Sequence, residues 1–175
     1  MTIALAEPIS RPPEAAVPGP IQDWRVVPAK TQIRFTVGRF LGAIHGTLNT
    51  VSGVVRLIEG QPRYTHVDIR VPVTALDIRT RRRLRVDSNP YPFVSFYGWR
   101  IRGNPRRSFA VDGQLQVGEF RRDVVVNVSA SDHRFDDATG TEEATFRAHL
   151  VVDRRIRFIL DVTLARVAVR YRRVA

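Results

Sequence analysis

Residues 31–40 read TQIRFTVGRF, a run in which apolar and polar side chains alternate. In an extended chain Ile33, Phe35 and Val37 share one face, because successive side chains of a strand point to opposite sides. Arg34 lies on the other face. This alternation is typical of a strand with one face buried and one face in water. The run therefore predicts a half-buried β-strand.

Strand-forming segments of β-branched and aromatic residues recur along the chain, separated by Gly, Pro, Asn and Asp. They are residues 44–50, 52–59, 64–71, 92–102, 107–118, 121–130, 144–153 and 156–164. After Leu164 the apolar phase of the last segment changes at Val167. A β-bulge near Ala165 and Arg166 explains such a change, because a bulge inserts one extra residue into a strand.

These segments predict an all-β domain of about eight antiparallel strands. Only residues 73–85, VTALDIRTRRRLR, look helical, and they predict one short helical connection. Strands with one apolar face close into a barrel or pair into a sandwich. The periodicity by itself leaves both architectures open.

The composition fits one soluble domain behind a leader. The chain has 175 residues, of which 43% are hydrophobic, and it has no cysteine, which excludes disulfides and thiolate chemistry. Residues 1–23 are rich in proline and lack periodicity, so we expect a disordered leader there and the barrel domain over 24–175. No apolar run reaches the length of a membrane-spanning helix, and the N-terminus does not resemble a secretory signal. We expect a cytoplasmic protein as written, or a periplasmic one if the true start lies upstream.

The sequence offers little for catalysis or metal binding. His45, His66 and His149 fall on polar strand faces, and His133 is expected in a loop, so we predict surface histidines and no metal site. Residues 129–143, SASDHRFDDATGTEE, are expected to form a solvated acidic loop. We find no serine on a sharp glycine-flanked turn, no acid and base pair and no phosphate loop, and therefore predict no catalytic residue and no enzyme.

The net charge of +11 comes almost entirely from arginine, since Lys30 is the single lysine among 28 basic residues. Sheets that bind nucleic acid interleave aromatic and basic residues on an exposed face. Here the strand phenylalanines share the apolar phase, so we expect no nucleic-acid partner. The denser runs at residues 79–85 and 170–173 are expected to attract phosphate head groups or an anionic membrane surface. We assign the head-group role to Arg81, Arg82 and Arg83.

The order of several motifs resembles the YceI-like family of lipocalin-like, polyisoprenoid-binding proteins, from about Trp24 to Leu164. The segments that carry the resemblance are WRVVPAKTQIRFTV (24–37), FLGAIHGTLNTVSGVVRL (40–57), VPVTALDIRTRRRLR (71–85), NPYPFVSF (89–96), VDGQLQVGEFRRDVVVNV (111–128) and AHLVVDRRIRF (148–158).

The resemblance implies a closed, lipocalin-like, eight-stranded antiparallel barrel that transports or stores a long apolar ligand in its interior. The ligand would be a polyisoprenoid, an isoprenoid quinone or another amphipathic lipid, with no other cofactor. Strands of about ten residues leave room for an extended chain of about 20 to 30 Å. The apolar residues of the inward phase are then the predicted ligand-binding set, to which Phe96 and Trp99 are added: Phe35, Val37, Phe96, Trp99, Phe109, Val111, Leu115, Phe146, Leu150, Phe158 and Leu160.

Two other functions stay open at this point. One is an enzyme or enzyme subunit that uses the same cavity, and the other is an arginine-rich protein that binds anionic surfaces or nucleic acid. Ligand retained in an organic extract separates lipid binding from both, and steep salt dependence of polyanion binding favours the second. The sequence does not decide whether two barrels associate as a homodimer.

Overall fold

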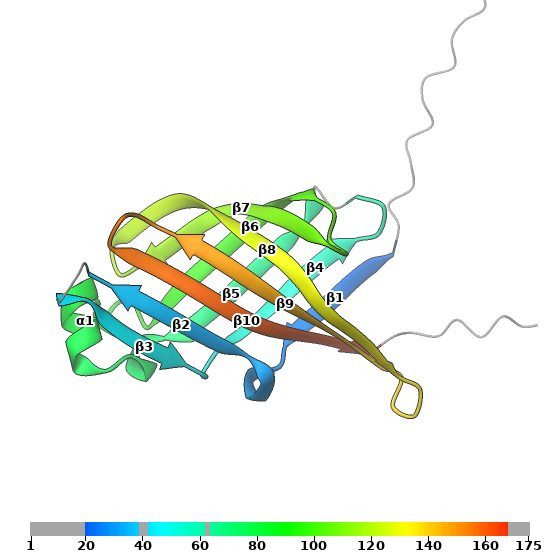
Figure 1. The fold of residues 1–175 in the computed structure, drawn as a ribbon, viewed down its shortest axis with the longest axis horizontal. Helices are drawn as coiled ribbons and strands as arrows, with labels where there is room; N and C mark the ends of the chain where they lie inside the picture. Colours follow the sequence, from blue (N-terminus) through cyan, green and yellow to red (C-terminus); the bar gives the residue numbers. More distant parts are fainter. Residues whose placement is uncertain (1–19, 39–41, 62–63, 168–175) are drawn as a thin grey trace, which may run out of the picture.

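The computed structural model describes residues 20–38, 42–61 and 64–167 of the chain. Ten strand segments and one α-helix account for most of this part (Figure 1). The strands are β1 (Ile21–Val26), β2 (Gln32–Val37), β3 (Ile44–Leu48), β4 (Ser52–Ile58), β5 (His66–Pro72), β6 (Phe93–Gly103), β7 (Ser108–Val117), β8 (Phe120–Asp136), β9 (Thr141–Val151) and β10 (Ile156–Val167). The helix is α1 (Ile78–Leu84), and two short 3-10 turns are η1 (Pro28–Lys30) and η4 (Val73–Ala75).

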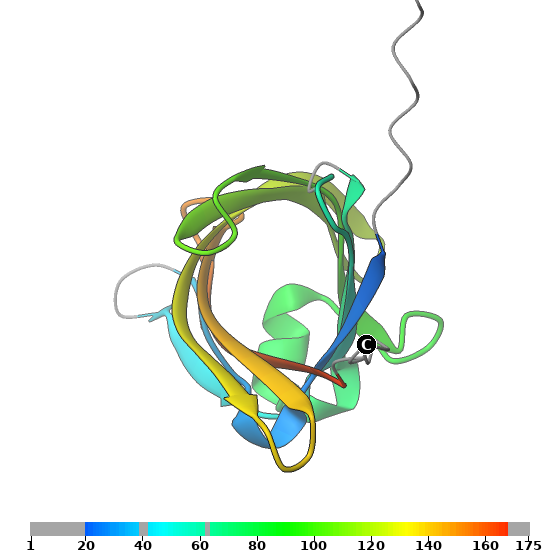
Figure 2. The same ribbon diagram turned by 90° about the vertical axis from the view of Figure 1, so that its right-hand side faces the viewer.

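The strands close into an eight-stranded antiparallel barrel. The hydrogen-bonded order runs β1, β4, β5, β6, β7, β8, β9, β10, and the ring closes where Arg25 and Val26 of β1 pair with Ala165 and Leu164 of β10. After η1, β2 continues along β10, and β3 pairs with β2. The end-on view shows the closed ring (Figure 2). The predicted barrel is confirmed, and the sandwich alternative is excluded.

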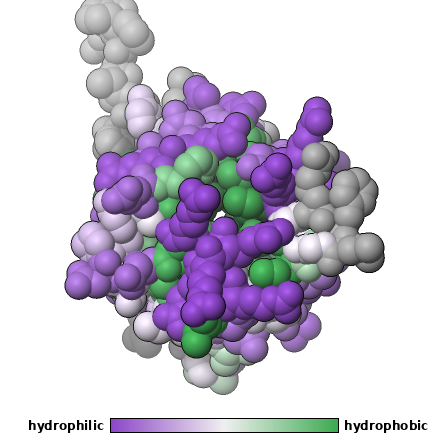
Figure 3. Space-filling model, turned by 90° about the vertical axis from the view of Figure 1, so that its left-hand side faces the viewer, coloured by the Kyte–Doolittle hydropathy of each residue, from purple (hydrophilic) through white to green (hydrophobic). Residues whose placement is uncertain are grey.

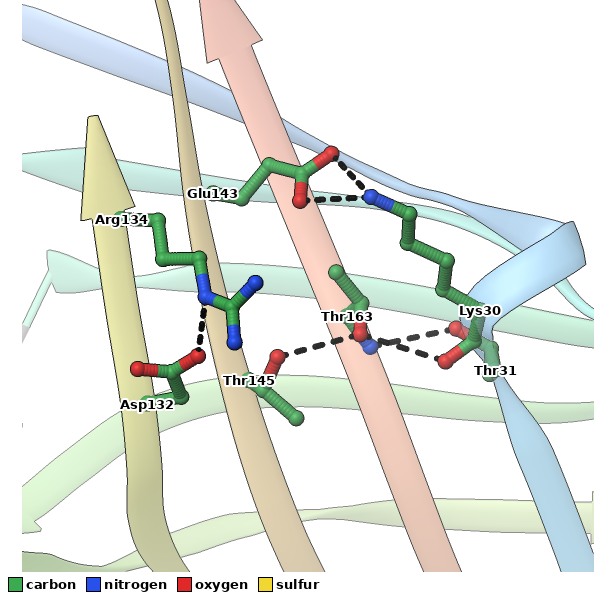
Figure 4. Close-up of polar contacts among 7 residues, drawn as sticks. All are labelled: Lys30, Thr31, Asp132, Arg134, Glu143, Thr145 and Thr163. Atoms are coloured by element: carbon green, nitrogen blue, oxygen red, sulfur yellow. Dashed lines mark hydrogen bonds and ion pairs between the residues drawn. The ribbon is translucent and has the colours of Figure 1, made fainter. Parts of the chain in front are cut away.

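Polar side chains hold the junction between β1 and β2 against the neighbouring strands (Figure 4). Lys30 Nζ donates to Glu143 at 2.7 Å, and the Thr163 hydroxyl donates to the Lys30 carbonyl at 3.2 Å. The Thr163 backbone N–H donates to Thr31 Oγ1 at 3.2 Å, and the Thr145 and Thr163 hydroxyls lie 3.2 Å apart. These bonds link η1 and the start of β2 to β9 and β10. They hold the chain against the barrel at the point where η1 separates β1 from β2.

Two details of strand phase differ from the predictions. The predicted bulge near Ala165 and Arg166 is wrong, because β10 pairs with β9 without a register shift as far as Val167 opposite Thr141. The register shifts lie instead in β6, between Gly98 and Arg100, and in β8, between Ala130 and Asp132. In addition, residues 130–136 extend β8 and pair with β9, so the first half of the predicted acidic loop, including His133, is a strand.

The boundary of the leader also needs a correction. Residues 21–23 belong to β1, where they pair with Ile58, Leu57 and Arg56 of β4, so the folded domain begins before Trp24. Pairing with β4 stabilises this segment as a strand. Three residues are too few for hydrophobic periodicity to predict a strand there. Residues 1–19 and the predicted basic run at 170–173 lie outside the described residues.

The predicted helical connection is confirmed as α1, which lies across one end of the barrel (Figures 1 and 2). Asp77 caps the helix by accepting hydrogen bonds from the Thr80 backbone N–H at 2.8 Å and the Thr80 hydroxyl at 2.9 Å. Arg85 ends it in the left-handed region with φ of 55°. In the described part of the chain no helix has the length and apolar character needed to cross a bilayer.

Candidate functional site

The barrel encloses an elongated cavity of about 930 Å³. Every strand of the ring contributes to its wall, and the wall is mainly apolar. The Phe109 and Phe146 rings meet edge to face in this wall, with centroids 5.9 Å apart. Packed protein interiors leave few voids larger than a water molecule, so a space of this size is suited to a ligand.

Nine of the eleven predicted ligand-binding residues line the cavity. They are Phe35, Phe96, Phe109, Val111, Leu115, Phe146, Leu150, Phe158 and Leu160. Val37 is buried in the core at the end of β2 but does not line the cavity.

The placement of Trp99 in the site is wrong. Its side chain is 42% exposed and does not line the cavity. Trp99 lies at the β6 bulge, between Gly98 opposite Gly113 and Arg100 opposite Asp112. The extra residue reverses the alternation, so Phe96 and Ile101 both line the cavity although their separation in sequence is odd.

Glycines make room for two of the large side chains. A Cβ atom on Gly113 would lie 2.5 Å from Phe96 Cζ, and one on Gly46 would lie 2.2 Å from Phe35 Cζ. Both glycines therefore let a phenyl ring lie flat against the neighbouring strand. Larger residues at these positions would push Phe96 and Phe35 into the cavity.

Several wall residues were not predicted. Trp24, Ile33, Leu48, Val55, Leu57, Val67, Ile69, Leu76, Leu84, Ile101, Val162 and Leu164 also line the cavity. Many share the inward phase of strands that the sequence did identify, such as β4 and β5, so extending the phase argument to those strands would have found them. Leu76 precedes α1 and Leu84 is its last residue, and both belong to the connection that covers one end of the barrel.

Polar lining residues gather at the end opposite α1, which we call the mouth. It is formed by Gln22, Glu59, Arg106, Asp132, His133, Glu142 and Arg166, at the ends of β1, β4, β8, β9 and β10 and in the turn between β6 and β7 (Figure 1). The rest of the wall is apolar except for Ser95 and Ser131. The cavity therefore has an apolar body and one polar end.

Glu142 is the centre of an ion-pair cluster at the mouth. His133 Nε2 lies 2.6 Å from one carboxylate oxygen, and Arg166 Nε donates to the other at 2.6 Å. Burial alone would raise the pKa of Glu142, but hydrogen bonds from Arg166 and His133 outweigh it and hold the pKa below its ordinary value. The unbroken phase of β10 places Arg166 here, since Leu164 and Arg166 both line the cavity.

The Trp24 side chain adds a hydrogen-bond donor next to this cluster. The Arg166 guanidinium carbon lies 4.8 Å from the centroid of the Trp24 ring, a cation–π arrangement. The indole Nε1 is buried without a hydrogen-bond partner among the described residues. A buried N–H without an acceptor is unfavourable, so this wall position would gain from an acceptor oxygen brought within reach.

Arg81, Arg82 and Arg83 do not lie at the cavity. All three are on α1, at the end opposite the mouth, and none lines the wall. Arg82 and Arg83 are exposed, and Arg83 Nη2 donates to the Gly42 carbonyl at 3.1 Å. In this segment the side chains that reach the cavity are those of Leu76 and Leu84. The head-group role assigned to these arginines stays a prediction, and their position places it at the outer surface of this end and not at the cavity.

The described residues hold no group of three His, Asp or Glu side chains placed to bind a metal ion. His66 instead packs edge to face on Tyr97, with ring centroids 4.8 Å apart, and His45 Nδ1 lies 3.1 Å from the Thr36 hydroxyl. His149 is exposed on β9.

Comparisons with known proteins agree with this fold. The family model of the YceI-like domain matches residues 24–164. Among solved structures, the crystal structure of Burkholderia cenocepacia BcnA superposes with a TM-score of 0.59 at 15% identity, covering 81% of this chain and 99% of that one. At this identity the likeness shows the fold alone. No curated protein matches the chain.

Proposed function

Because this chain belongs to the YceI-like family of polyisoprenoid-binding proteins, we propose that it binds one extended amphipathic isoprenoid lipid inside the barrel, and that it carries this lipid without transforming it. The observation that supports the proposal best is the form of the cavity, with about 930 Å³ enclosed by a mainly apolar wall and polar groups gathered at one end.

The apolar body of the cavity suits the hydrocarbon tail. Burying apolar surface contributes about 25 cal/mol per Å² removed from water, so a long chain is held without any specific polar contact. The aromatic side chains of the wall offer flat surfaces to the unsaturated units of an isoprenoid. We infer that the tail extends from the mouth towards Leu76 and Leu84.

The mouth suits a polar end group that accepts hydrogen bonds. The unpartnered Trp24 Nε1–H, and the guanidinium N–H groups of Arg166 that Glu142 does not use, are donors. Arg106 also lines the mouth and forms no ion pair among the described residues. A quinone carbonyl, a hydroxyl and a phosphate all present the acceptor oxygen that this set of donors favours.

We also propose that the protein does not catalyse a reaction on the bound lipid. The carboxylate of Glu142 is held between Arg166 and His133, and its lowered pKa makes it a poor proton acceptor at neutral pH. The lining residues serve to enclose and orient a ligand, and an acyl or phosphoryl transfer would need an activated nucleophile in addition.

The experiment is mass spectrometry of an organic extract of protein purified without detergent, together with the Phe146→Trp variant. We expect the wild-type extract to hold a long-chain lipid near one molecule per barrel. Phe146→Trp adds bulk inside the cavity, so we expect it to fold normally and to retain several-fold less lipid. Phe120→Trp is the matched control, because Phe120 is 47% exposed and does not line the cavity.

An empty wild-type extract, combined with strong destabilisation by Phe146→Trp, would contradict the proposal. That pair of results means that the interior is already filled by side chains, since added bulk strains a packed core by about 1–3 kcal/mol.

A further inference from the structure

The end of the barrel covered by α1 carries a dense group of exposed arginines, which we call the arginine end. They come from α1 and its C-cap, from the start of β8 and from the turn that joins β9 to β10: Arg79, Arg82, Arg83, Arg85, Arg121, Arg122, Arg154 and Arg155. Gly118 packs against the Arg85 carbonyl, and the Gly38 N–H donates to the Arg155 carbonyl at 2.7 Å. These contacts bring the separate segments to one end of the molecule.

These eight arginines differ from the others in their pairing. Elsewhere in the described residues, basic side chains are mostly neutralised by carboxylates within 3.1 Å, as at Lys30, Arg34, Arg56, Arg70, Arg100, Arg102, Arg134, Arg147 and Arg166. None of the ion pairs found within the described ranges includes an arginine of the arginine end. Among the residues that the structure describes, arginines without an ion pair are therefore densest at this end.

Three of the carboxylates nearby accept hydrogen bonds from the backbone instead. Asp77 accepts from the Thr80 N–H at 2.8 Å, and Asp153 accepts from the N–H groups of Arg155 and Ile156 at 2.6 and 3.0 Å. Asp87 accepts from the Asn89 N–H at 3.4 Å. These groups hold the helix cap and the turns in place, and among the described residues none of them forms an ion pair with an arginine of the arginine end.

Exposed apolar side chains lie between the arginines. Ile78, in the first turn of α1, is 61% exposed, Phe120 at the start of β8 is 47% exposed, and Phe93 at the start of β6 is 38% exposed. The space-filling view of this end shows hydrophilic side chains crossing the face with hydrophobic ones between them (Figure 3).

From this arrangement we propose that the arginine end docks on an anionic phospholipid membrane. Guanidinium groups form paired hydrogen bonds with phosphate, and exposed apolar side chains among them enter the headgroup region. A nucleic acid would also attract the arginines, but its charged backbone would offer no apolar environment for the exposed side chains of Ile78 and Phe120. The mouth, where Glu59, Asp132 and Glu142 lie, then faces away from the anionic surface.

The test compares two double variants that each remove two positive charges. Arg82→Gln with Arg154→Gln removes two of the eight charges of the arginine end, and Arg25→Gln with Arg107→Gln removes two exposed arginines elsewhere that form no ion pair among the described residues. Binding is measured by co-sedimentation with phosphatidylcholine vesicles with and without phosphatidylglycerol, at low and high salt. We expect binding only with phosphatidylglycerol and a loss of roughly 25-fold in the first variant, since each arginine near such a surface contributes about fivefold. The second variant should lose less than fivefold.

Equal losses in the two variants would overturn the proposal, because they would show that net charge acts without regard to position. A tryptophan reporter gives an independent readout of insertion. Ile78→Trp should shift its fluorescence emission to the blue on anionic vesicles, whereas Val167→Trp near the mouth should not. An unchanged Ile78→Trp spectrum, or tighter binding of single-stranded oligonucleotide than of vesicles at the same salt, would also overturn it. The outcome is separate from the cargo proposal, because the arginine end is on the outer surface and an empty barrel presents it equally.

Discussion

Asp112 shows how one residue of the barrel wall depends on a local irregularity. It is 8% exposed, and it accepts from Arg100 Nε at 2.7 Å and from Arg102 Nη2 at 2.7 Å. The bulge at Trp99 puts both arginines on the outer face, with Arg100 directly opposite Asp112 and Arg102 opposite Ala110. The Arg102 hydrogen bond is the main cause that lowers the pKa of Asp112 below its ordinary 3.8, with burial opposing it and Arg100 adding to it.

We predict that Asp112→Asn lowers the free energy of unfolding by about 1–2 kcal/mol at neutral pH, because charged hydrogen bonds are lost while both arginines remain largely exposed. Since the folded-state pKa lies below the unfolded one, the stabilisation by Asp112 is full above pH 3.8 and is lost as the pH falls through the folded-state value. Urea unfolding at about pH 6 and at about pH 2.5 should therefore show that the free energy of unfolding falls less with pH in the variant than in the wild type. Parallel curves for the two proteins would contradict this role.

At the scale of the strands, alternation predicted the apolar wall and failed at the mouth. Phe35, Phe146 and Phe158 were found because an inward position in the middle of a strand is apolar. At the mouth an inward position meets water, so Arg166 keeps the inward phase although it is charged. The apolar side chain of Val167 suggests a change of phase at this point, and that interpretation leads to the wrong bulge and overlooks the cluster around Glu142. A polar residue that continues the inward phase at the end of a strand is thus a signal for a cavity opening.

The connection that contains α1 forms the end wall opposite the mouth, and it should limit the length of the bound chain. We predict that Leu84→Ala deepens the cavity and shifts the extracted lipids towards longer chains, because Leu84 lines the cavity at this end. Leu84→Trp should shift them towards shorter ones. Mass spectrometry of the extracts measures both, and Ile78→Ala on the exposed side of α1 is the control. Identical chain lengths in all variants would mean that the tail does not reach α1.

At the scale of the whole molecule, the features that could not be predicted from the sequence depend on contacts between residues far apart in the chain. Closure depends on two pairs between β1 and β10, which are separated by most of the chain. The net charge of +11 could be counted, but its concentration at one end depends on which arginines meet a carboxylate across strands, as Arg34 and Arg147 meet Asp161. The resemblance to a family supplied the closed barrel that periodicity left undecided.

The cavity extends along the barrel and is lined by every strand of the ring. A lipid bound in it should therefore stabilise the whole fold. The core side chains of all strands border a space of about 930 Å³, and an empty apolar space lacks the dispersion contacts that a packed core provides. A ligand that binds only the folded state adds about 2.7 kcal/mol at a free concentration of one hundred times its Kd. For a chain of this size, that corresponds to a rise in Tm of about 5–10 °C.

We therefore predict that protein stripped of lipid melts about 5–10 °C below the protein as purified, and that adding back the extracted lipid restores the difference. Differential scanning calorimetry measures both transitions, and circular dichroism before heating verifies that the stripped protein is folded. Phe146→Trp is the internal control, because its filled cavity should make Tm nearly independent of the lipid. If stripped and reloaded wild-type protein melt at the same temperature, the lipid that is extracted is bound outside the barrel, and the cavity is not the binding site.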